Sequence, residues 1–373
     1  MSLLFTPLQL PSPRGGLTLP NRIVVAPMCQ YSAVDGCATD YHLAHWTSLL
    51  NSGAGLFTIE ATAVSPEGRI TPNCLGLWDD ATEAALTDYL QRARALAPHT
   101  AVCIQLAHAG RKASSAVPWR GGQLLSRAQE GWQPLGPSAL SQLPTEAPPD
   151  ALTVADMQGV RDDFVASAMR AERAGVDAVE LHGAHGYLLH QFLSPLANQR
   201  EDDYGGSYEN RIRFPLEVFA AVRAAYKGVL GLRLSASDWV EGGWDLAQST
   251  AFGQRLKEAG CDFIHVSSAG VSPQQKIVLG DGYQVPFARA IRAATGMVTT
   301  AVGLITQPAQ AEAILQNGDA DLIALARAFL YQPRWGWQAA AALGEQVQAF
   351  PTYWRCMPRE AQGIFKDAKV GQR

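Results

Sequence analysis

The chain has few of the features that mark metal-binding or disulfide-linked proteins. Its 373 residues include only six cysteines, which are widely scattered and form no C-x-x-C pair. This distribution argues against a zinc ribbon, an iron–sulfur cluster and a disulfide framework. It favours a reducing compartment, and we expect a cytoplasmic protein.

Basic clusters and long apolar runs are also missing. The chain carries 30 Lys+Arg against 34 Asp+Glu, and no more than two basic residues are adjacent, so we expect no nucleic-acid surface. No apolar stretch reaches the roughly 18 residues that a membrane span needs. The N-terminus, M-S-L-L-F-T-P-L-Q-L-P, lacks the basic head and apolar run of a signal peptide. We therefore expect neither nucleic acid nor membrane as a partner.

Short apolar runs do recur, and each is followed by a helical pattern. The predicted strands are bounded by turn formers and cover Arg22–Ala26, Leu56–Ala61, Ala101–Leu106, Ala178–Leu181, Gly231–Ser235, Phe263–Val266, Val298–Val302 and Leu322–Leu325. The predicted helices cover Thr153–Ala174, Tyr208–Tyr226, Leu246–Ala259, Gln307–Asn317 and Arg334–Leu343. Eight strands alternating with helices predict an α/β fold, a single (β/α)8 TIM barrel with an N-terminal hairpin, formed by residues 1–373 as one domain.

One long segment interrupts this alternation. Residues Gly110–Asp150 are rich in proline, glycine and serine and follow the third predicted strand. A loop of this length in a compact domain is usually a lid or a binding insertion. A doubly wound sheet is the alternative fold, but no G-x-G-x-x-G follows the first strand.

The most informative motif is E-L-H-G-A-H-G-Y, from Glu180 to Tyr187. It places two imidazoles and a phenol on a glycine-containing turn at the end of a strand. Two imidazoles can donate to one small oxygen, and a nearby phenol can move a proton. His182 and His185 also have the spacing of metal ligands, which keeps a metal-dependent barrel hydrolase or aldolase as a rival. Against that rival, no third ligand stands at similar spacing, and we expect Glu180 on a different face from the histidines.

Other candidate site residues stand at or just after the ends of the remaining strands, and a barrel brings the carboxyl ends of its strands together. They are Cys29, Tyr31, Gln105, Arg233, Gly303 and Arg327. Taken singly, Cys29 can be an inert thiol, Gln105 a loop amide and Arg327 the partner of a carboxylate. Arg233 lies between leucines, and a buried arginine needs an anionic or strongly polar partner.

With these residues in place, the chain resembles the old yellow enzymes, the FMN-dependent ene-reductases, and specifically their thermophilic-like branch. The resemblance covers nearly the whole chain. It rests on N-R-I-V-V-A-P-M-C-Q-Y at 21–31, Q-L-A-H-A-G-R-K at 105–112, A-G-V-D-A-V-E-L-H-G-A-H-G-Y-L-L-H-Q-F-L-S-P at 174–195, N-Q-R-x-D-x-Y-G-G-S-Y-E-N-R-x-R-F at 198–214, R-L-S-A-S-D at 233–238 and A-D-L-I-A-L-A-R at 320–327.

The resemblance implies one continuous FMN site. The residues that it places along the flavin ring are Ala26, Pro27, Met28 and Cys29, with the thiol near the reactive N5/O4 edge. Those that it places at the pyrimidine side are Ala61, Gln105 and Arg233, the arginine at N1/O2. Those that it places at the phosphate are Gly303, Ala326 and Arg327.

The same resemblance implies a ping-pong reduction of activated alkenes, including α,β-unsaturated carbonyls. NADPH reduces the flavin, and hydride then passes from flavin N5 to the alkene β-carbon. His182 and His185 bind the carbonyl oxygen, Tyr187 protonates the α-carbon, and Tyr31 adds a hydrogen bond. A flavin-binding protein without turnover, such as a sensor, is a third hypothesis.

The C-terminal Tyr353-Trp354-Arg355 resembles a segment that enters a neighbour's active site. It makes Trp354 a candidate substrate-binding residue in the expected homodimer or homotetramer. The alternative is a tail that caps its own barrel.

Overall fold

The computed structural model describes residues 2–369 and 371, so that Met1 and three residues of the predicted 1–373 domain lie outside the described part. In the described part, eight parallel strands close into a barrel in the order β10-β11-β12-β3-β4-β5-β8-β9. The strands are β3 (Ile23–Val25), β4 (Leu56–Ala63), β5 (Ala101–Ala107), β8 (Ala178–Gly183), β9 (Val229–Ser235), β10 (Phe263–Ser267), β11 (Val298–Ala301) and β12 (Leu322–Leu325). The predicted TIM barrel is confirmed, and each predicted strand overlaps one of these.

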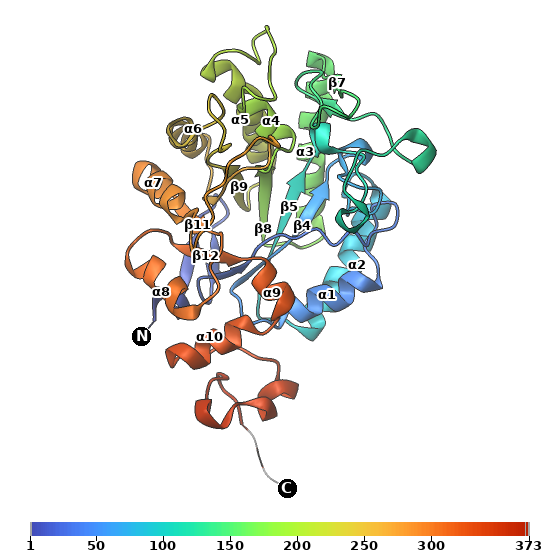
Figure 1. Cartoon of the computed structure of the whole chain (residues 1–373). Coiled ribbons are helices and arrows are strands. Elements are labelled where there is room, and N and C mark those ends of the chain that lie inside the picture. The colour runs from blue at the N-terminus through green and yellow to red at the C-terminus, as the bar shows by residue number, and fades with distance from the viewer. Residues whose placement is uncertain (1, 370, 372–373) are drawn as a thin grey trace.

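Helices surround the barrel (Figure 1). They are α1 (Asp40–Leu50), α2 (Asp80–Leu96), α3 (Val154–Arg173), α4 (Leu188–Leu193), α5 (Tyr208–Ala225), α6 (Leu246–Glu258), α7 (Val285–Thr295), α8 (Pro308–Gln316), α9 (Arg327–Tyr331) and α10 (Trp335–Leu343). The five predicted helices agree with α3, α5, α6, α8 and α10 to within a residue at each end. Side-chain caps explain that agreement, because Thr153 and Asp245 accept backbone N–H groups at the starts of α3 and α6.

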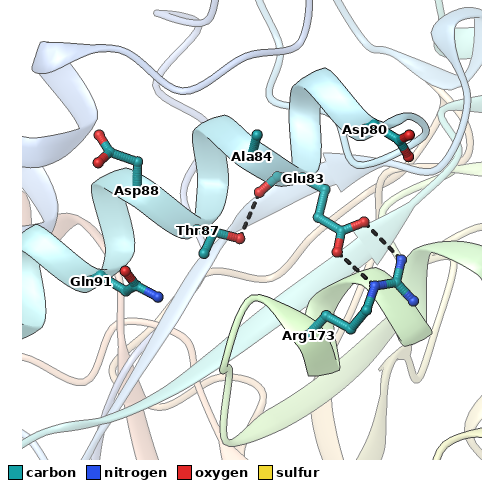
Figure 2. Close-up of a pocket in the computed structure, with 7 residues that line it drawn as sticks. All are labelled: Asp80, Glu83, Ala84, Thr87, Asp88, Gln91 and Arg173. Carbon is teal, nitrogen blue, oxygen red and sulfur yellow. Dashed lines mark hydrogen bonds and ion pairs between the residues drawn. The ribbon is translucent and has the colours of Figure 1, made fainter.

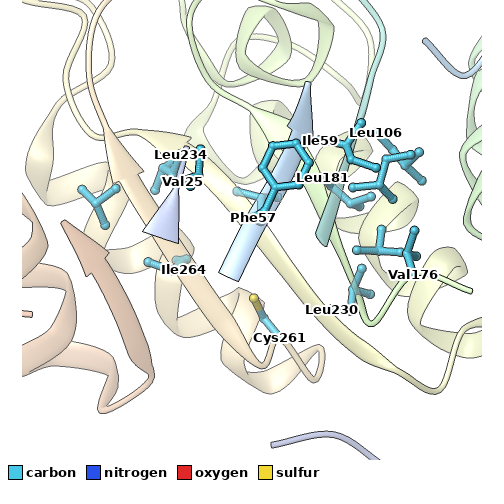
Figure 3. Close-up of a cluster of buried hydrophobic side chains, with 14 of the residues drawn as sticks. Val25, Phe57, Ile59, Leu106, Val176, Leu181, Leu230, Leu234, Cys261 and Ile264 are labelled. Carbon is cyan, nitrogen blue, oxygen red and sulfur yellow. The ribbon is translucent and has the colours of Figure 1, made fainter. Parts of the chain in front are cut away.

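Alternation along the strands separates two apolar layers. Outward-facing side chains such as Val25, Phe57 and Leu181 pack beneath the helices, and Figure 3 shows these side chains on the strands of the barrel. Inward-facing side chains such as Val24 and Phe263 form a second cluster inside the barrel. Burial on both faces accounts for the near-continuous apolar runs in the sequence.

The predicted N-terminal hairpin closes one end of the barrel. Strands β1 (Leu8–Leu10) and β2 (Leu17–Leu19) pair antiparallel. Leu10 and Leu19 are fully buried in the inner cluster. Because this end is closed by apolar side chains, a site inside the barrel has to open at the carboxyl ends of the strands.

The predicted insertion follows β5 and contains only short pieces of structure, among them β6 (Leu135–Gly136) and β7 (Asp150–Ala151), which pair in parallel. Figure 1 shows this insertion and the C-terminal segment at opposite ends of the molecule. Within the described residues, no helix is both long enough and apolar enough to cross a membrane.

Candidate active site

Inward-facing residues become polar toward the carboxyl ends of the strands. Glu180 and His182 occupy alternate positions on β8, and His182 pairs in register with Arg233 on β9. Side chains two apart on a strand share a face. The prediction that Glu180 faces away from the histidines is therefore wrong for His182, because this residue still belongs to the strand and not to the turn.

A buried network lies below the barrel mouth. Gln105 Nε2 donates to Glu180 Oε1 at 2.6 Å, and His265 Nδ1 donates to Glu180 Oε2 at 2.9 Å. Burial by itself raises the pKa of Glu180, but the interactions with His265, Arg233 and Gln105 outweigh it and hold the pKa below its usual value. Glu180 is thus a carboxylate inside the barrel.

The two histidines of the turn form a short relay. His182 Nδ1 accepts the Ala184 N–H at 3.2 Å, so its proton lies on Nε2, which is 3.4 Å from His185 Nδ1. His185 Nε2 in turn lies 2.8 Å from Ser267 Oγ. Burial, followed by the charge of Arg233, holds the pKa of both histidines well below 6.5. Both imidazoles are therefore neutral, and each carries a single N–H.

Tyr187 lies beside this relay. Its ring centroid is 4.8 Å from that of His182, edge to face. Burial raises the pKa of Tyr187 well above 10, so the phenol keeps its proton. Lys112 Nζ lies 5.0 Å from the centre of the tyrosine ring and donates to the carbonyl of His185 at 2.9 Å. The insertion, which contains Lys112, therefore supports the turn.

A second buried pair holds the turn from behind. The Gly186 N–H donates to His190 Nδ1 at 2.9 Å, and His190 Nε2 donates to Asp238 Oδ1 at 2.9 Å. His190 lies in α4, and its side chain and that of Asp238 are completely buried.

The segment after β3 brings Cys29 and Tyr31 to the same mouth. Its backbone is held at Gln30, whose N–H donates to Glu60 Oε2 at 2.8 Å. The pairing of β4 with β5 shifts between Ile59 and Ala61, so Ala61 is the residue opposite Gln105. This bulge places Glu60 against the β3 segment and leaves the small Ala61 beside the amide.

Tyr31 and Cys29 lie at the surface of the mouth, where both are half-buried. Burial raises the pKa of the Cys29 thiol well above its usual value, so the thiol is protonated. Tyr31 has a φ of 52°, and its ring meets that of Trp119 edge to face at 5.7 Å. The sequence did not single out Trp119, which comes from the insertion and is 69% exposed.

A pocket of about 190 Å³ opens at the ends of β9, β11 and β12. Its lining includes Arg233, Gly303, Ala326 and Arg327, four of the predicted site residues. Gly303 has a φ of +116°, and a Cβ there would lie 2.5 Å from Gln284 Nε2. Only glycine fits this backbone position without displacing its neighbours.

Trp354 lies elsewhere. Its Nε1 donates to Ala349 O at 3.1 Å, and it packs on a C-terminal cluster that includes Trp337 and Val347. A Cβ on Gly53, in the turn before β4, would touch both of these residues, so the cluster covers the amino end of the barrel. Trp354 does not reach the mouth of its own barrel, and a role in a neighbour's barrel stays a prediction.

A wider depression of about 620 Å³ lies on the outside of the barrel, along α2 (Figure 2). Its charged groups all have partners: Glu83 binds Arg173 through two contacts of 2.7 Å, and Asp80 and Asp88 pair with arginines of α3 and α2. It contains none of the strand-end residues. In the described residues, no group of three or more His, Cys, Asp or Glu is arranged to hold a metal ion.

Fold and site together define a barrel oxidoreductase of the flavin-dependent class. The sequence model of the NADH:flavin oxidoreductase / NADH oxidase family matches residues 3–346. The chain belongs to this family, which includes the old yellow enzymes, and it uses FMN and a nicotinamide nucleotide.

Individual relatives agree with this assignment. The NADPH dehydrogenase of Bacillus licheniformis is 45% identical over 92% of this chain and 96% of its own length. The NADPH dehydrogenase of Halalkalibacterium halodurans is 42% identical over 91% of this chain and 95% of its own length. The solved structure of morphinone reductase superposes with a TM-score of 0.75 at 30% identity, covering 99% of this chain and 94% of the other.

The residues of the mouth fit FMN. Arg233 is buried, yet its Nε has no hydrogen-bond partner among the described residues. An unpaired buried guanidinium is costly unless a ligand completes it. The pocket that contains Arg233 also has the Gly303 backbone and the exposed Arg327 at its edge, which suits a group with a polar ring and an anionic tail.

Proposed function

We propose that this protein reduces the C=C bond of α,β-unsaturated carbonyls and related activated alkenes with NADPH, in a ping-pong cycle. Bound FMN supplies the hydride chemistry. The observation that carries the proposal is the arrangement of His182, His185 and Tyr187 on one turn beside the unpaired Arg233.

His182 and His185 bind the substrate oxygen in this proposal. Both imidazoles are neutral N–H donors with depressed pKa values. Two such donors stabilise negative charge that develops on a carbonyl oxygen, and they need no proton from solvent to do so. They also orient the alkene in the mouth.

Tyr187 acts as the general acid. Its phenol stays protonated at neutral pH and lies edge to face with His182, so a substrate held by the histidines has an O–H donor beside it. Tyr31 supplies a further hydrogen bond to the substrate. Cys29 lies in the same mouth with a protonated thiol and is placed to tune the cofactor.

The proposed FMN contacts follow the predicted set. Ala26, Pro27 and Met28 lie on the segment that leads to Cys29, and the first two are buried. Ala61 and Gln105 are register partners, and this supports their assignment to the pyrimidine ring. Arg233 would contact the N1/C2 carbonyl edge of the flavin ring. The phosphate would be held by Gly303, Ala326 and Arg327.

The setting of this activity is part of the same proposal. The chain would act as one FMN-binding domain of the thermophilic-like branch, in the cytoplasm, as a homodimer or homotetramer. The described cysteines are all free, as a reducing compartment requires. Trp354 or Arg355 would contribute to a site only across a subunit boundary.

An anaerobic spectroscopic experiment tests the proposal. The purified protein should be yellow, NADPH should bleach its absorbance, and 2-cyclohexenone should restore it. Colourless protein that takes up no added FMN, with stoichiometric zinc, would favour a metal-dependent hydrolase or aldolase. Flavin that NADPH reduces but that no activated alkene reoxidises would indicate a sensor.

A further inference from the structure

Glu180 is an enclosed charged residue below the mouth, and its contacts account for both of its oxygens. It is 1% exposed. Gln105 Nε2 donates to one oxygen at 2.6 Å and His265 Nδ1 to the other at 2.9 Å. A buried carboxylate with both oxygens bound in this way stays ionised at neutral pH.

Arg233 lies next to this carboxylate without forming an ion pair with it. It is flanked in register by His182 on β8 and by His265 on β10. Among the described residues, no carboxylate lies within ion-pairing distance of Arg233, and its Nε has no partner. Because Gln105 and His265 already bind the two oxygens of Glu180, this carboxylate balances the charge of Arg233 without direct contact. The guanidinium therefore remains free to bind a ligand.

The contact with Glu180 also fixes the Gln105 side chain. Since Nε2 donates to the carboxylate, the amide cannot flip without placing its own oxygen against a negative charge. The amide therefore keeps one carbonyl acceptor and one N–H donor for another partner. Gln105 and Arg233 are the two polar residues assigned to the pyrimidine ring.

We propose that Glu180 is a positioning residue of the flavin site, which orients Gln105 and lowers the reduction potential of bound FMN by offsetting the charge of Arg233. This inference rests on the proposed assignment of Gln105 and Arg233 to the pyrimidine ring. Reduced FMN carries more negative charge there than oxidised FMN. A fixed carboxylate nearby disfavours the reduced form, and removing it should favour that form.

The test is the midpoint potential of the FMN holoenzyme, measured by equilibration with a reference dye, with FMN affinity measured separately by fluorescence titration. Glu180→Gln removes the charge with little change in shape, and Glu180→Met replaces the ion with an apolar side chain of similar length. We expect both to shift the equilibrium toward reduced FMN by at least tenfold, about 30 mV for a two-electron couple. Glu180→Asp keeps the charge and should stay close to wild type.

The matched control is Asp262→Asn. Asp262 precedes β10 at the other end of the barrel, where it is paired with Arg223 at 2.9 Å. Its removal takes away one negative charge without touching the mouth, and the potential should not change. A similar shift in this control would mean that the potential follows the overall charge of the protein and not the position of Glu180, and it would overturn the proposal.

Arg233→Ala, which removes the positive charge, separates this inference from the proposed function. If it changes neither FMN affinity nor the potential, the assignment of Arg233 to the flavin fails. If it changes them while Glu180→Gln leaves the potential unaltered, only the role of Glu180 fails. If neither Glu180→Gln nor Glu180→Met gives folded holoenzyme while Glu180→Asp does, the carboxylate serves the fold and the proposal is likewise overturned.

Discussion

His190 Nδ1 accepts the backbone N–H of Gly186 at 2.9 Å, directly between His185 and Tyr187 in the sequence. Behind it, His190 is bonded to the buried Asp238. His190→Phe would leave the Gly186 N–H and the carboxylate without this partner, at about 1–3 kcal/mol for each group. We expect a loss of this size in urea denaturation, together with slower alkene reduction.

His190→Asn provides the control for that change. An asparagine amide offers one acceptor and one donor close to their original positions. It should recover part of both the stability and the rate. Equal losses in the two variants would show that this pair does not hold the turn.

The backbone at Gly303 gives a prediction about cofactor affinity. Gly303→Ala adds a Cβ 2.5 Å from Gln284 Nε2 at a φ of +116°. Alanine in this region costs about 1–2 kcal/mol even without the clash. Fluorescence titration should show FMN affinity falling at least tenfold.

Gly122→Ala is the matched variant, because Gly122 also has a positive φ but has open space around it. It should keep the wild-type affinity for FMN. If both variants bind FMN as wild type does, the pocket at Gly303 does not hold the cofactor.

Buried neutral histidines predict acid sensitivity. Burial lowers the pKa of His108 from 6.5 to about 4. The unfolded chain therefore binds more protons than the folded one between these pH values, and stability falls as pH drops from 6.5 toward 4. The slope from one such histidine is about 1.4 kcal/mol per pH unit.

Urea denaturation at several pH values checks this slope. His108→Asn should lower the slope of the unfolding free energy against pH by the contribution of one proton, because asparagine does not titrate. His99→Asn, at an exposed position, controls for the loss of a histidine. An unchanged slope in His108→Asn would contradict the prediction.

Local patterns were enough to predict the barrel from the sequence. Strands buried on both faces produce apolar runs, and caps such as Thr153 mark helix starts. Five helices were not predicted, namely α1, α2, α4, α7 and α9, although α2 has its own cap at Asp79. The motifs that predicted the strand-end residues also gave their order around the mouth.

Other features of the site depend on contacts between distant segments. The bulge at Glu60 became visible only through the pairing of β4 with β5. The burial of His190 depends on Asp238, 48 residues further along the chain. Trp119 reaches Tyr31 because the insertion folds back over the mouth. Sequence spacing carries no information about such contacts.

The assignment of separate roles to the histidines and the tyrosine is tested most directly by Tyr187→Phe. The measurement is the anaerobic reoxidation of NADPH-reduced enzyme by 2-cyclohexenone in single turnover, compared with reoxidation by oxygen. Loss of the general acid should slow the alkene reaction by about 10²–10⁴-fold and leave the oxygen reaction largely intact. Equal slowing of both reactions, or no slowing of either, would contradict the role of Tyr187 as proton donor.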